Sequence, residues 1–334
     1  MESLQRKTLV TCRELKYTYF VSLSTESTQD HPVLLFIHGF PDSAHLWSAL
    51  VAKLRGLRNK IIIPDCLGYA GTDKPEDPTA YAFIDQAKDL VDILQHENAK
   101  STVIIGHDWG SALAQRTYLH HRELISGMVL LNTGYMVPQE QPFDLAAVNT
   151  FSAKTLGYPQ FAYWEFLIAA DASSIVEGNL ERMWQVMHGD VEDWMRKLFC
   201  VRNAMRDFLV GNDRVPLKDY ANQLEWKDTF MTQFQRDGFA SALQMYKATT
   251  LNIQYMSDST IPKDKLAIEV PILFFLCNKD AVCTSEMMTE AKRRGLVPDL
   301  KEVVLECAHW SPMENPNEIA KHIKEFILDR FSCN

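Results

Sequence analysis

The chain has 334 residues, of which 46% are hydrophobic and 23% are charged, and its formal net charge is −9. This composition is typical of a folded globular protein and excludes a largely disordered chain. Acidic and basic residues are scattered and no Lys/Arg block occurs. The sequence therefore predicts no nucleic-acid partner and favours a neutral or apolar substrate.

Residues 1–7 carry charges with no apolar stretch behind them, and no apolar run reaches the length of a membrane span. The seven cysteines are dispersed and form no C-x-x-C pair, a pattern that favours reduced thiols over a disulfide framework. The sequence shows no metal-ligand spacing. We therefore expect a cytoplasmic protein, a monomer or homodimer, that uses no metal and no cofactor.

Short apolar runs bounded by turn residues predict strands at 33–37, 61–63, 103–105, 128–131, 272–276 and 303–305. Because these runs are continuously apolar, we expect strands that are buried on both faces. Two earlier segments, near 8–11 and 17–22, alternate more and predict an antiparallel edge. Helical patterns such as 81–95 and 319–331 accompany the runs. The order predicts an α/β fold with a mostly parallel, doubly wound sheet of eight strands.

The alternation of strands and helices stops between about residues 134 and 246. Helical patterns and four of the seven tryptophans gather there. We predict a helical cap at 137–246, inserted between two parts of a core at 1–136 and 247–334. Methionine and aromatic residues at helical spacing are more often core than ligand pocket, so composition alone locates no site in this block.

The pentapeptide at 106–110, Gly-His-Asp-Trp-Gly, follows a predicted strand and precedes a helical stretch. This is the pattern of a nucleophile elbow, in which the central residue is exposed on a strained turn and the glycines let strand and helix approach closely. The central residue is Asp108 and not a serine. A carboxylate is already ionised, so it points to alkylation of Asp108 at a substrate carbon instead of acyl transfer. On the pentapeptide alone, a helix N-cap role for Asp108 is an equal alternative.

Functional groups in doubly wound sheets gather beyond the carboxyl ends of the strands. The segment after 33–37 reads His38-Gly39-Phe40-Pro41, a tight turn in which Phe40–Pro41 is a candidate cis peptide. The Phe40 N–H and the Trp109 N–H are candidates for an oxyanion hole. Taken by itself, this segment favours an ordinary turn followed by an Asp/Ser cap of the next helix.

Two further strand ends carry candidate catalytic side chains. Asp280 follows the strand at 272–276, and His309 follows the strand at 303–305. A solvated loop acid is the alternative for Asp280 in isolation. The chain order of nucleophile, acid and histidine, each after a separate strand, favours a triad in which Asp280 orients His309 as general base.

With these residues in place, the chain resembles the soluble epoxide hydrolases of the α/β-hydrolase fold, the fungal members above all. The resemblance rests on 38–41, 68–75, 106–110 and 309–310. It implies an α/β-hydrolase fold with a cap, and an enzyme that converts a small apolar epoxide and water to a vicinal diol through an ester of Asp108.

The same resemblance implies two cap tyrosines that hold the epoxide oxygen. The segments 161–164 and 238–247 correspond to their positions and give Tyr163 and Tyr246, with Tyr158 as the alternative for the first. A buried structural tyrosine is the alternative for each. We expect substrate contacts from four residues: His38, Pro41, Trp109 and Trp310.

Two other functions use the same scaffold. Haloalkane dehalogenases share the Asp and His chemistry but commonly place an asparagine where this chain has Phe40. A non-catalytic ligand-binding protein is the second alternative, because a fold does not determine a function. The intact Asp108, Asp280 and His309 pattern argues against the second, and the tyrosine matches argue against the first. The Trp- and Met-rich cap favours a bulky lipid or aromatic substrate if these residues line a pocket rather than a core.

Overall fold

The computed structural model of the chain describes residues 4–23 and 31–331. Its centre is an eight-stranded sheet in the order β1-β2-β4-β3-β5-β6-β7-β8. The strands are β1 Leu4–Val10, β2 Lys16–Ser22, β3 Val33–Ile37, β4 Ile61–Pro64, β5 Thr102–His107, β6 Ile125–Leu131, β7 Ile272–Cys277 and β8 Leu300–Leu305. The neighbours from β4 to β8 are parallel, whereas β1–β2 and β2–β4 are antiparallel. The predicted sheet and its antiparallel edge are confirmed.

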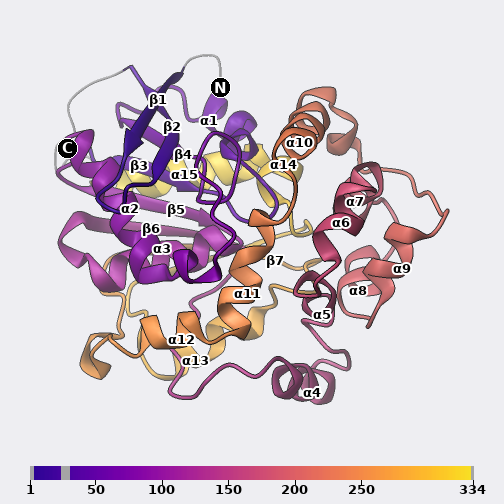
Figure 1. Ribbon diagram of the computed structural model, residues 1–334. Coiled ribbons are helices and arrows are strands. Elements are labelled where there is room, and N and C mark those ends of the chain that lie inside the picture. Colours follow the sequence, from indigo (N-terminus) through magenta and orange to yellow (C-terminus); the bar gives the residue numbers. More distant parts are fainter. Residues whose placement is uncertain (1–3, 24–30, 332–334) are drawn as a thin grey trace.

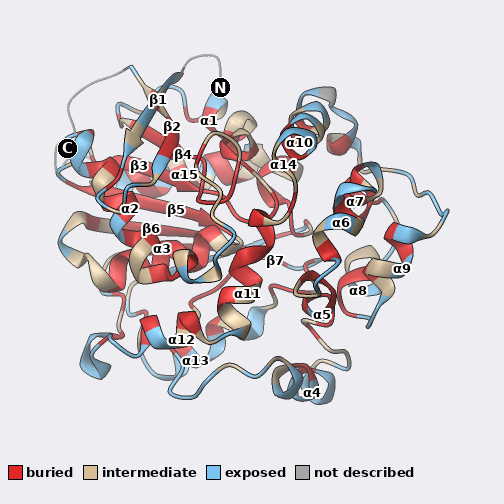
Figure 2. Ribbon diagram, in the orientation of Figure 1, coloured by how far each residue is buried: buried red, intermediate tan, exposed pale blue. Residues whose placement is uncertain are grey.

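The central strands are buried because their apolar runs face helices on both sides of the sheet. Every residue of β3, β4 and β5 is buried, and Figure 2 shows these strands in red. The same expectation is wrong for β8, where Val304 is 62% exposed. This strand is the last of the sheet, so one edge and part of one face lie in water.

Helices cover both faces of the sheet (Figure 1). The helix α2 packs on α3, and α1 packs on α15 on the opposite face. The predicted helices at 81–95 and 319–331 correspond to α2 and α15. The helices of the core are α1 Ser48–Lys53, α2 Phe83–His96, α3 Trp109–His120, α13 Thr289–Arg293, α14 Ser311–Glu314 and α15 Pro316–Phe331.

Between β6 and β7 the described chain forms helices instead of strands, as the sequence predicts. They are α4 Leu145–Thr155, α5 Trp164–Leu167, α6 Ala172–Glu177, α7 Leu180–His188, α8 Trp194–Phe199, α9 Ala204–Val210, α10 Leu224–Asp237, α11 Gln244–Thr250 and α12 Ile253–Asp258. We call α4 to α11 the helical insertion; in Figure 1 most of it lies to the right of the sheet. The predicted segment boundary at residue 246 falls inside α11, and the division into core and cap stays a prediction.

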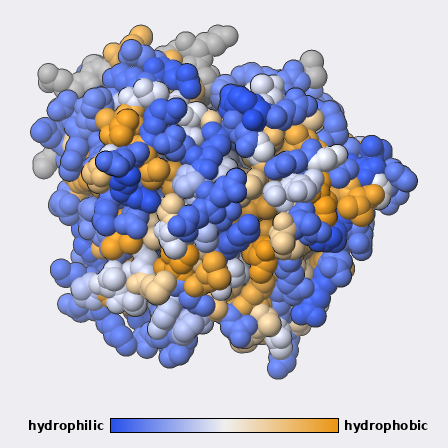
Figure 3. All heavy atoms as spheres, in the orientation of Figure 1, coloured by the Kyte–Doolittle hydropathy of each residue, from blue (hydrophilic) through white to orange (hydrophobic). Residues whose placement is uncertain are grey.

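The helical insertion is hydrogen-bonded to the loops that follow the strands. Tyr69 donates to the carbonyl of Ala242 (3.2 Å), and Ser241 donates to the carbonyl of Gly68 (2.8 Å). In the space-filling view, hydrophobic residues gather on this face around α11 and α5 (Figure 3). The insertion therefore lies over the carboxyl ends of the strands, where catalytic groups of this kind of sheet are expected.

Within the described ranges, no helix has the length and apolar character needed to cross a bilayer. Six cysteines in these ranges are free thiols, and Cys333 lies outside the described residues.

Candidate active site

Asp108 lies on a sharp turn between β5 and α3, with a φ of +55°. Glycines make this turn possible, because a Cβ on Gly110 would lie 2.1 Å from the carbonyl oxygen of Ile37 and a Cβ on Gly106 would lie 2.4 Å from that of Gly110. The Asp108 side chain makes no capping hydrogen bond to α3. The N-cap alternative for its carboxylate is therefore wrong, and the elbow geometry holds.

The structure brings the three predicted triad residues together. His309 Nδ1 lies 2.7 Å from Asp280 Oδ2, and His309 Nε2 lies 3.4 Å from Asp108 Oδ2. The three side chains come from the ends of β5, β7 and β8, which are brought close by the parallel order of the sheet. The imidazole thus lies between two carboxylates, with one of its nitrogens toward each.

The electrostatics of the three groups are coupled. Burial opposes charge on His309, but the carboxylates of Asp280 and Asp108 outweigh it and hold the His309 pKa well above its usual value. Burial likewise opposes charge on Asp108, but His309 and the Phe40 N–H hold the Asp108 pKa below its usual value. For Asp280, burial raises the pKa, but His309 and the hydrogen bonds to this carboxylate together lower it by more, so the Asp280 pKa is also below its usual value. Both acids are therefore ionised at neutral pH.

Asp280 accepts hydrogen bonds from other donors in addition to its contact with His309. Its Oδ1 accepts from the backbone N–H groups of Val282 (2.9 Å) and Cys283 (2.8 Å). Its Oδ2 accepts from Asn132 Nδ2 at 2.8 Å. This network fixes the carboxylate that orients the imidazole.

Asn132 and His107 are supporting residues that the sequence did not single out. Asn132 follows β6 with a φ of +64°, and its Oδ1 accepts from Ser311 Oγ at 2.7 Å. His107 Nε2 lies 2.8 Å from the carbonyl oxygen of His309. In the sequence, Asn132 could be noticed only because it directly follows a predicted strand. An asparagine at that place is equally typical of a turn.

The Phe40 N–H points at the nucleophile. It donates to Asp108 Oδ1 at 2.9 Å, and the peptide bond between Phe40 and Pro41 is cis, as predicted. A Cβ on Gly39 would lie 2.3 Å from Asp108 Oδ1, so glycine is required for this approach. Trp109 is the first residue of α3, where a backbone N–H has no partner within the helix. The pairing of this N–H with that of Phe40 in an oxyanion hole stays a prediction.

An apolar cavity of about 110 Å³ opens beside Asp108. Trp109, Tyr163 and Trp164 line it near the nucleophile. The ring centroids of Trp109 and Trp164 are 5.4 Å apart, and Tyr246 meets both rings edge-on. The nucleophile therefore lies at the end of an aromatic slot.

Tyr163 and Tyr246 lie side by side, with ring centroids 5.9 Å apart. Burial first, and then the nearby Asp108 carboxylate, raise the pKa of Tyr163 above its usual value; burial, Tyr163 and Asp108 do the same for Tyr246. Both hydroxyls therefore keep their protons at neutral pH. Tyr158 differs, since its hydroxyl donates to the carbonyl of Ala281 (3.1 Å) and its side chain lines another cavity.

Three residues expected to contact substrate lie apart from the aromatic slot. His38 Nδ1 lies 2.9 Å from the Gly39 carbonyl oxygen and its Nε2 accepts from the Cys66 N–H (2.9 Å), so backbone groups engage both ring nitrogens. Burial lowers the His38 pKa to about 4. Pro41 and Trp310 line other cavities. Substrate contact by these three residues stays a prediction.

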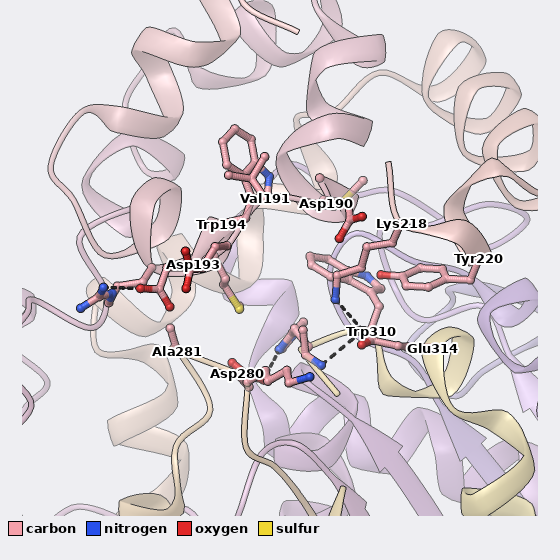
Figure 4. Close-up of a pocket in the computed structure, with 18 of the residues that line it drawn as sticks. Asp190, Val191, Asp193, Trp194, Lys218, Tyr220, Asp280, Ala281, Trp310 and Glu314 are labelled. Carbon is pink, nitrogen blue, oxygen red and sulfur yellow. Dashed lines mark hydrogen bonds and ion pairs between the residues drawn. The ribbon is translucent and has the colours of Figure 1, made fainter. Parts of the chain in front are cut away.

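His309 lines a second, polar cavity of about 1160 Å³, which Figure 4 shows. Asp280, Trp310 and Glu314 line it from the core, and Lys218 and Tyr220 line it from the helical insertion. His309 thus lines the polar cavity, while its Nε2 faces Asp108, which lines the aromatic slot.

Asp280, Cys283 and His309 also form a group whose potential metal-ligand atoms lie within 4.8 Å of one another. Four hydrogen bonds already engage the two oxygens of Asp280, and one of them is to His309. Burial raises the pKa of the Cys283 thiol to about 11, which disfavours the thiolate that a metal would need. We therefore regard Asp280 and His309 as members of the predicted triad and Cys283 as a buried neighbour of them.

Comparison with known protein families identifies the family of the chain. Its residues 32–316 match the family described as alpha/beta hydrolase fold. The chain belongs to this family, which confirms the fold implied by the resemblance.

The relatives include named enzymes from several kingdoms. The chain is 26% identical to rat bifunctional epoxide hydrolase 2 over 86% of its length, and it spans half of that longer protein. It is 27% identical to epoxide hydrolase A of Mycobacterium tuberculosis, with 89% of this chain and 90% of that protein covered. It is 25% identical to epoxide hydrolase srdG of Neurospora crassa, with 94% and 92% covered.

A solved structure has the same fold. Epoxide hydrolase VrEH1 from Vigna radiata superposes with a TM-score of 0.77 at 21% sequence identity, and the alignment covers 98% of this chain and 99% of that chain. At this identity the likeness supports the arrangement of sheet and helical insertion.

Proposed function

We propose that this protein is an epoxide hydrolase that adds water to an epoxide and releases a vicinal diol. One observation carries the proposal above the others. A carboxylate on a nucleophile elbow lines the aromatic slot together with Tyr163, whose ring contacts that of Tyr246. A histidine held by a second carboxylate lies 3.4 Å from this nucleophile. The names of the similar proteins support the same activity.

In the first half-reaction, Asp108 Oδ2 attacks an epoxide carbon and the strained C–O bond breaks. The electron pair of that bond goes to the oxygen, which takes a proton from Tyr163 or Tyr246 and a hydrogen bond from the other. The product is a hydroxyalkyl ester of Asp108. Its carbonyl oxygen is Oδ1, which the Phe40 N–H already holds.

In the second half-reaction, His309 takes a proton from water, and the water oxygen attacks the ester carbonyl carbon. The tetrahedral oxyanion faces the N–H groups of Phe40 and Trp109. When it collapses, the diol oxygen leaves with the proton from His309. The proton that remains on the Asp108 carboxyl group returns to the deprotonated tyrosine, so Asp108 regains its carboxylate and the tyrosine its hydroxyl. Ester formation removes a negative charge next to His309, so its pKa falls and it becomes a free base when a base is needed.

The tyrosines distinguish this reaction from dehalogenation. A halide needs no proton when it leaves, whereas an alkoxide does, and two hydroxyls with raised pKa values fit the second. The Phe40 side chain, at the position of the expected asparagine, packs against the Tyr246 ring at 5.0 Å. A non-catalytic binding protein would not require a buried Asp280 and His309 pair next to the Asp108 carboxylate.

The finer description also belongs to the proposal. We assign 137–246 to a cap over the site, and the aromatic slot to a small apolar epoxide. Dispersed free cysteines support the cytoplasm, and we propose a monomer or homodimer.

The test separates the two half-reactions. In His309→Gln, alkylation of Asp108 should proceed but hydrolysis should stop, so intact-mass spectrometry after addition of an aryl epoxide should show the protein plus one substrate mass. Asp108→Asn is the control and should gain no mass. A His309→Gln protein that remains unmodified would contradict the proposal, and so would halide release from a haloalkane without any diol from the epoxide.

A further inference from the structure

The loop that carries His309 is tethered on several sides. The carbonyl oxygens of His309 and Ala308 lie 2.8 Å and 3.2 Å from His107 Nε2 and Asn132 Nδ2, which belong to the core. The N–H of Ala308 donates to Glu314 Oε2 at 3.2 Å. Glu314 is the last residue of the short helix α14 that follows the loop. Its carboxylate therefore holds the residue directly before the general base.

Glu314 is in turn held by the helical insertion. Lys218 Nζ lies 2.7 Å from the same Oε2, and both side chains are mostly covered, with 23% and 21% exposed. The Lys218 N–H donates to the carbonyl of His188 at the end of α7 (3.0 Å), which fixes the lysine backbone within the insertion. Figure 4 shows Lys218 reaching Glu314 beside Trp310.

A ring contact accompanies the ion pair. The Trp310 ring lies 4.9 Å from the His309 ring and 4.8 Å from the His188 ring of the insertion. Burial lowers the His188 pKa well below its usual value, so this contact is between uncharged rings. The insertion therefore meets the His309 loop at one charged and one aromatic contact.

We propose that Glu314, held by Lys218, is a positioning residue for the hydrolytic half-reaction. The inference rests on the proposed function. During alkylation the charged Asp108 itself attracts His309, 3.4 Å away. Once the ester forms, that attraction is lost, and the imidazole depends on Asp280 and on its own loop to aim at water. Removing the Glu314 tether should then slow the second half-reaction and spare the first.

The experiment measures the two half-reactions separately. Single-turnover rapid mixing with an aryl epoxide follows ester formation by tryptophan fluorescence and quenched-flow mass spectrometry, and then ester decay. Lys218→Met and Glu314→Leu should each slow ester decay about tenfold and leave ester formation within about twofold of the wild type, since small displacements of a catalytic group are costly. The double variant should be no slower than the slower single variant, because both changes break one chain of contacts.

Lys279→Met is the matched control. Lys279 lines the same polar cavity, but its Nζ pairs with the exposed Glu306 at 3.8 Å and not with Glu314. This variant should keep both rates.

Unchanged ester decay in Glu314→Leu would overturn the proposal, and so would an equal loss in both half-reactions, which indicates a merely structural ion pair. Lys218→Met, with its partly exposed side chain, keeps the test valid if Glu314→Leu folds poorly. Failure of the wild type to form any ester would instead contradict the proposed function.

Discussion

At the residue scale, the two oxygens of Asp108 have different surroundings. Oδ1 accepts from the Phe40 N–H, whereas Oδ2 faces His309. The first contact fits a future ester carbonyl and the second fits the attacking atom. The Asp108 backbone has a φ of +55°, which residues other than glycine rarely adopt and which is typical of the exposed residue of a nucleophile elbow.

The tyrosines lead to a prediction at the same scale. Tyr163→Phe and Tyr246→Phe should each slow ester formation, but by less than the upper end of the range of about 10² to 10⁴ typical of general acids, because the remaining hydroxyl still reaches the oxygen. The double variant should lose more than either single one. Tyr158→Phe is the control, since its hydroxyl binds the Ala281 carbonyl. Single-turnover ester formation measures all four, and two silent single variants would contradict the assignment.

A site residue was predictable from the sequence where chain order alone determines its position, and was not where its position depends on tertiary packing. Asp108, Asp280 and His309 follow separate apolar runs, and a parallel sheet brings such ends together, so chain order sufficed to predict that they meet. Asn132 was missed because its function depends on β6 lying between β5 and β7. Tyr158 and Tyr163 could not be separated, because only tertiary packing determines that the Tyr158 hydroxyl donates to the Ala281 carbonyl and that Tyr163 lines the cavity beside Asp108.

At the element scale, Glu97 at the carboxyl end of α2 contacts the middle of β1 and of β2. Its carboxylate is 2.8 Å from Lys7 Nζ on β1, 2.6 Å from Lys60 Nζ before β4, and accepts from the Tyr19 hydroxyl of β2 at 2.7 Å. Burial alone would raise the Glu97 pKa, but these partners lower it to about 2. The antiparallel edge is thus attached to α2 by one ionised side chain.

Glu97→Gln should destabilise the protein by about 1–3 kcal/mol at neutral pH, because two ammonium groups and a hydroxyl lose a charged acceptor. A lowered pKa in the folded state gives stability that is present above the unfolded value of about 4.3 and is lost as the pH falls toward 2. The difference between variant and wild type should therefore shrink over that interval. Urea unfolding at several pH values measures it, with the exposed Glu123→Gln as control; a pH-independent difference would contradict the assignment.

Strand positions were predictable at this scale, and strand environments were less so. The run at 33–37 coincides with β3, and five other runs fall inside β4 to β8. The error at β8 arose because an apolar run shows that a segment prefers burial, whereas exposure depends on its place in the sheet order. The helices of the insertion were predictable as a class, but their order around the slot required the tertiary structure.

At the scale of the whole molecule, the aromatic slot lies between the core and the helical insertion. A neutral aryl urea, whose carbonyl should face Tyr163 and Tyr246, would contact both parts and bind the folded protein alone. Mass action then predicts about 2.7 kcal/mol of added stability at 100 times the Kd. Thermal unfolding with and without the urea measures this, and the Tyr163→Phe/Tyr246→Phe double variant should show a smaller shift. Equal shifts would contradict binding at the tyrosines.

The separation of the site residues along the chain has a consequence for folding. His107 and His309 are 202 positions apart and still share a contact. Such distant segments meet only after most of the intervening chain has been ordered, which makes their encounter entropically expensive. No early folding intermediate should therefore hold an assembled triad. Recovery of ester formation during refolding should trail recovery of helical circular dichroism, so that catalysis reports the completion of folding.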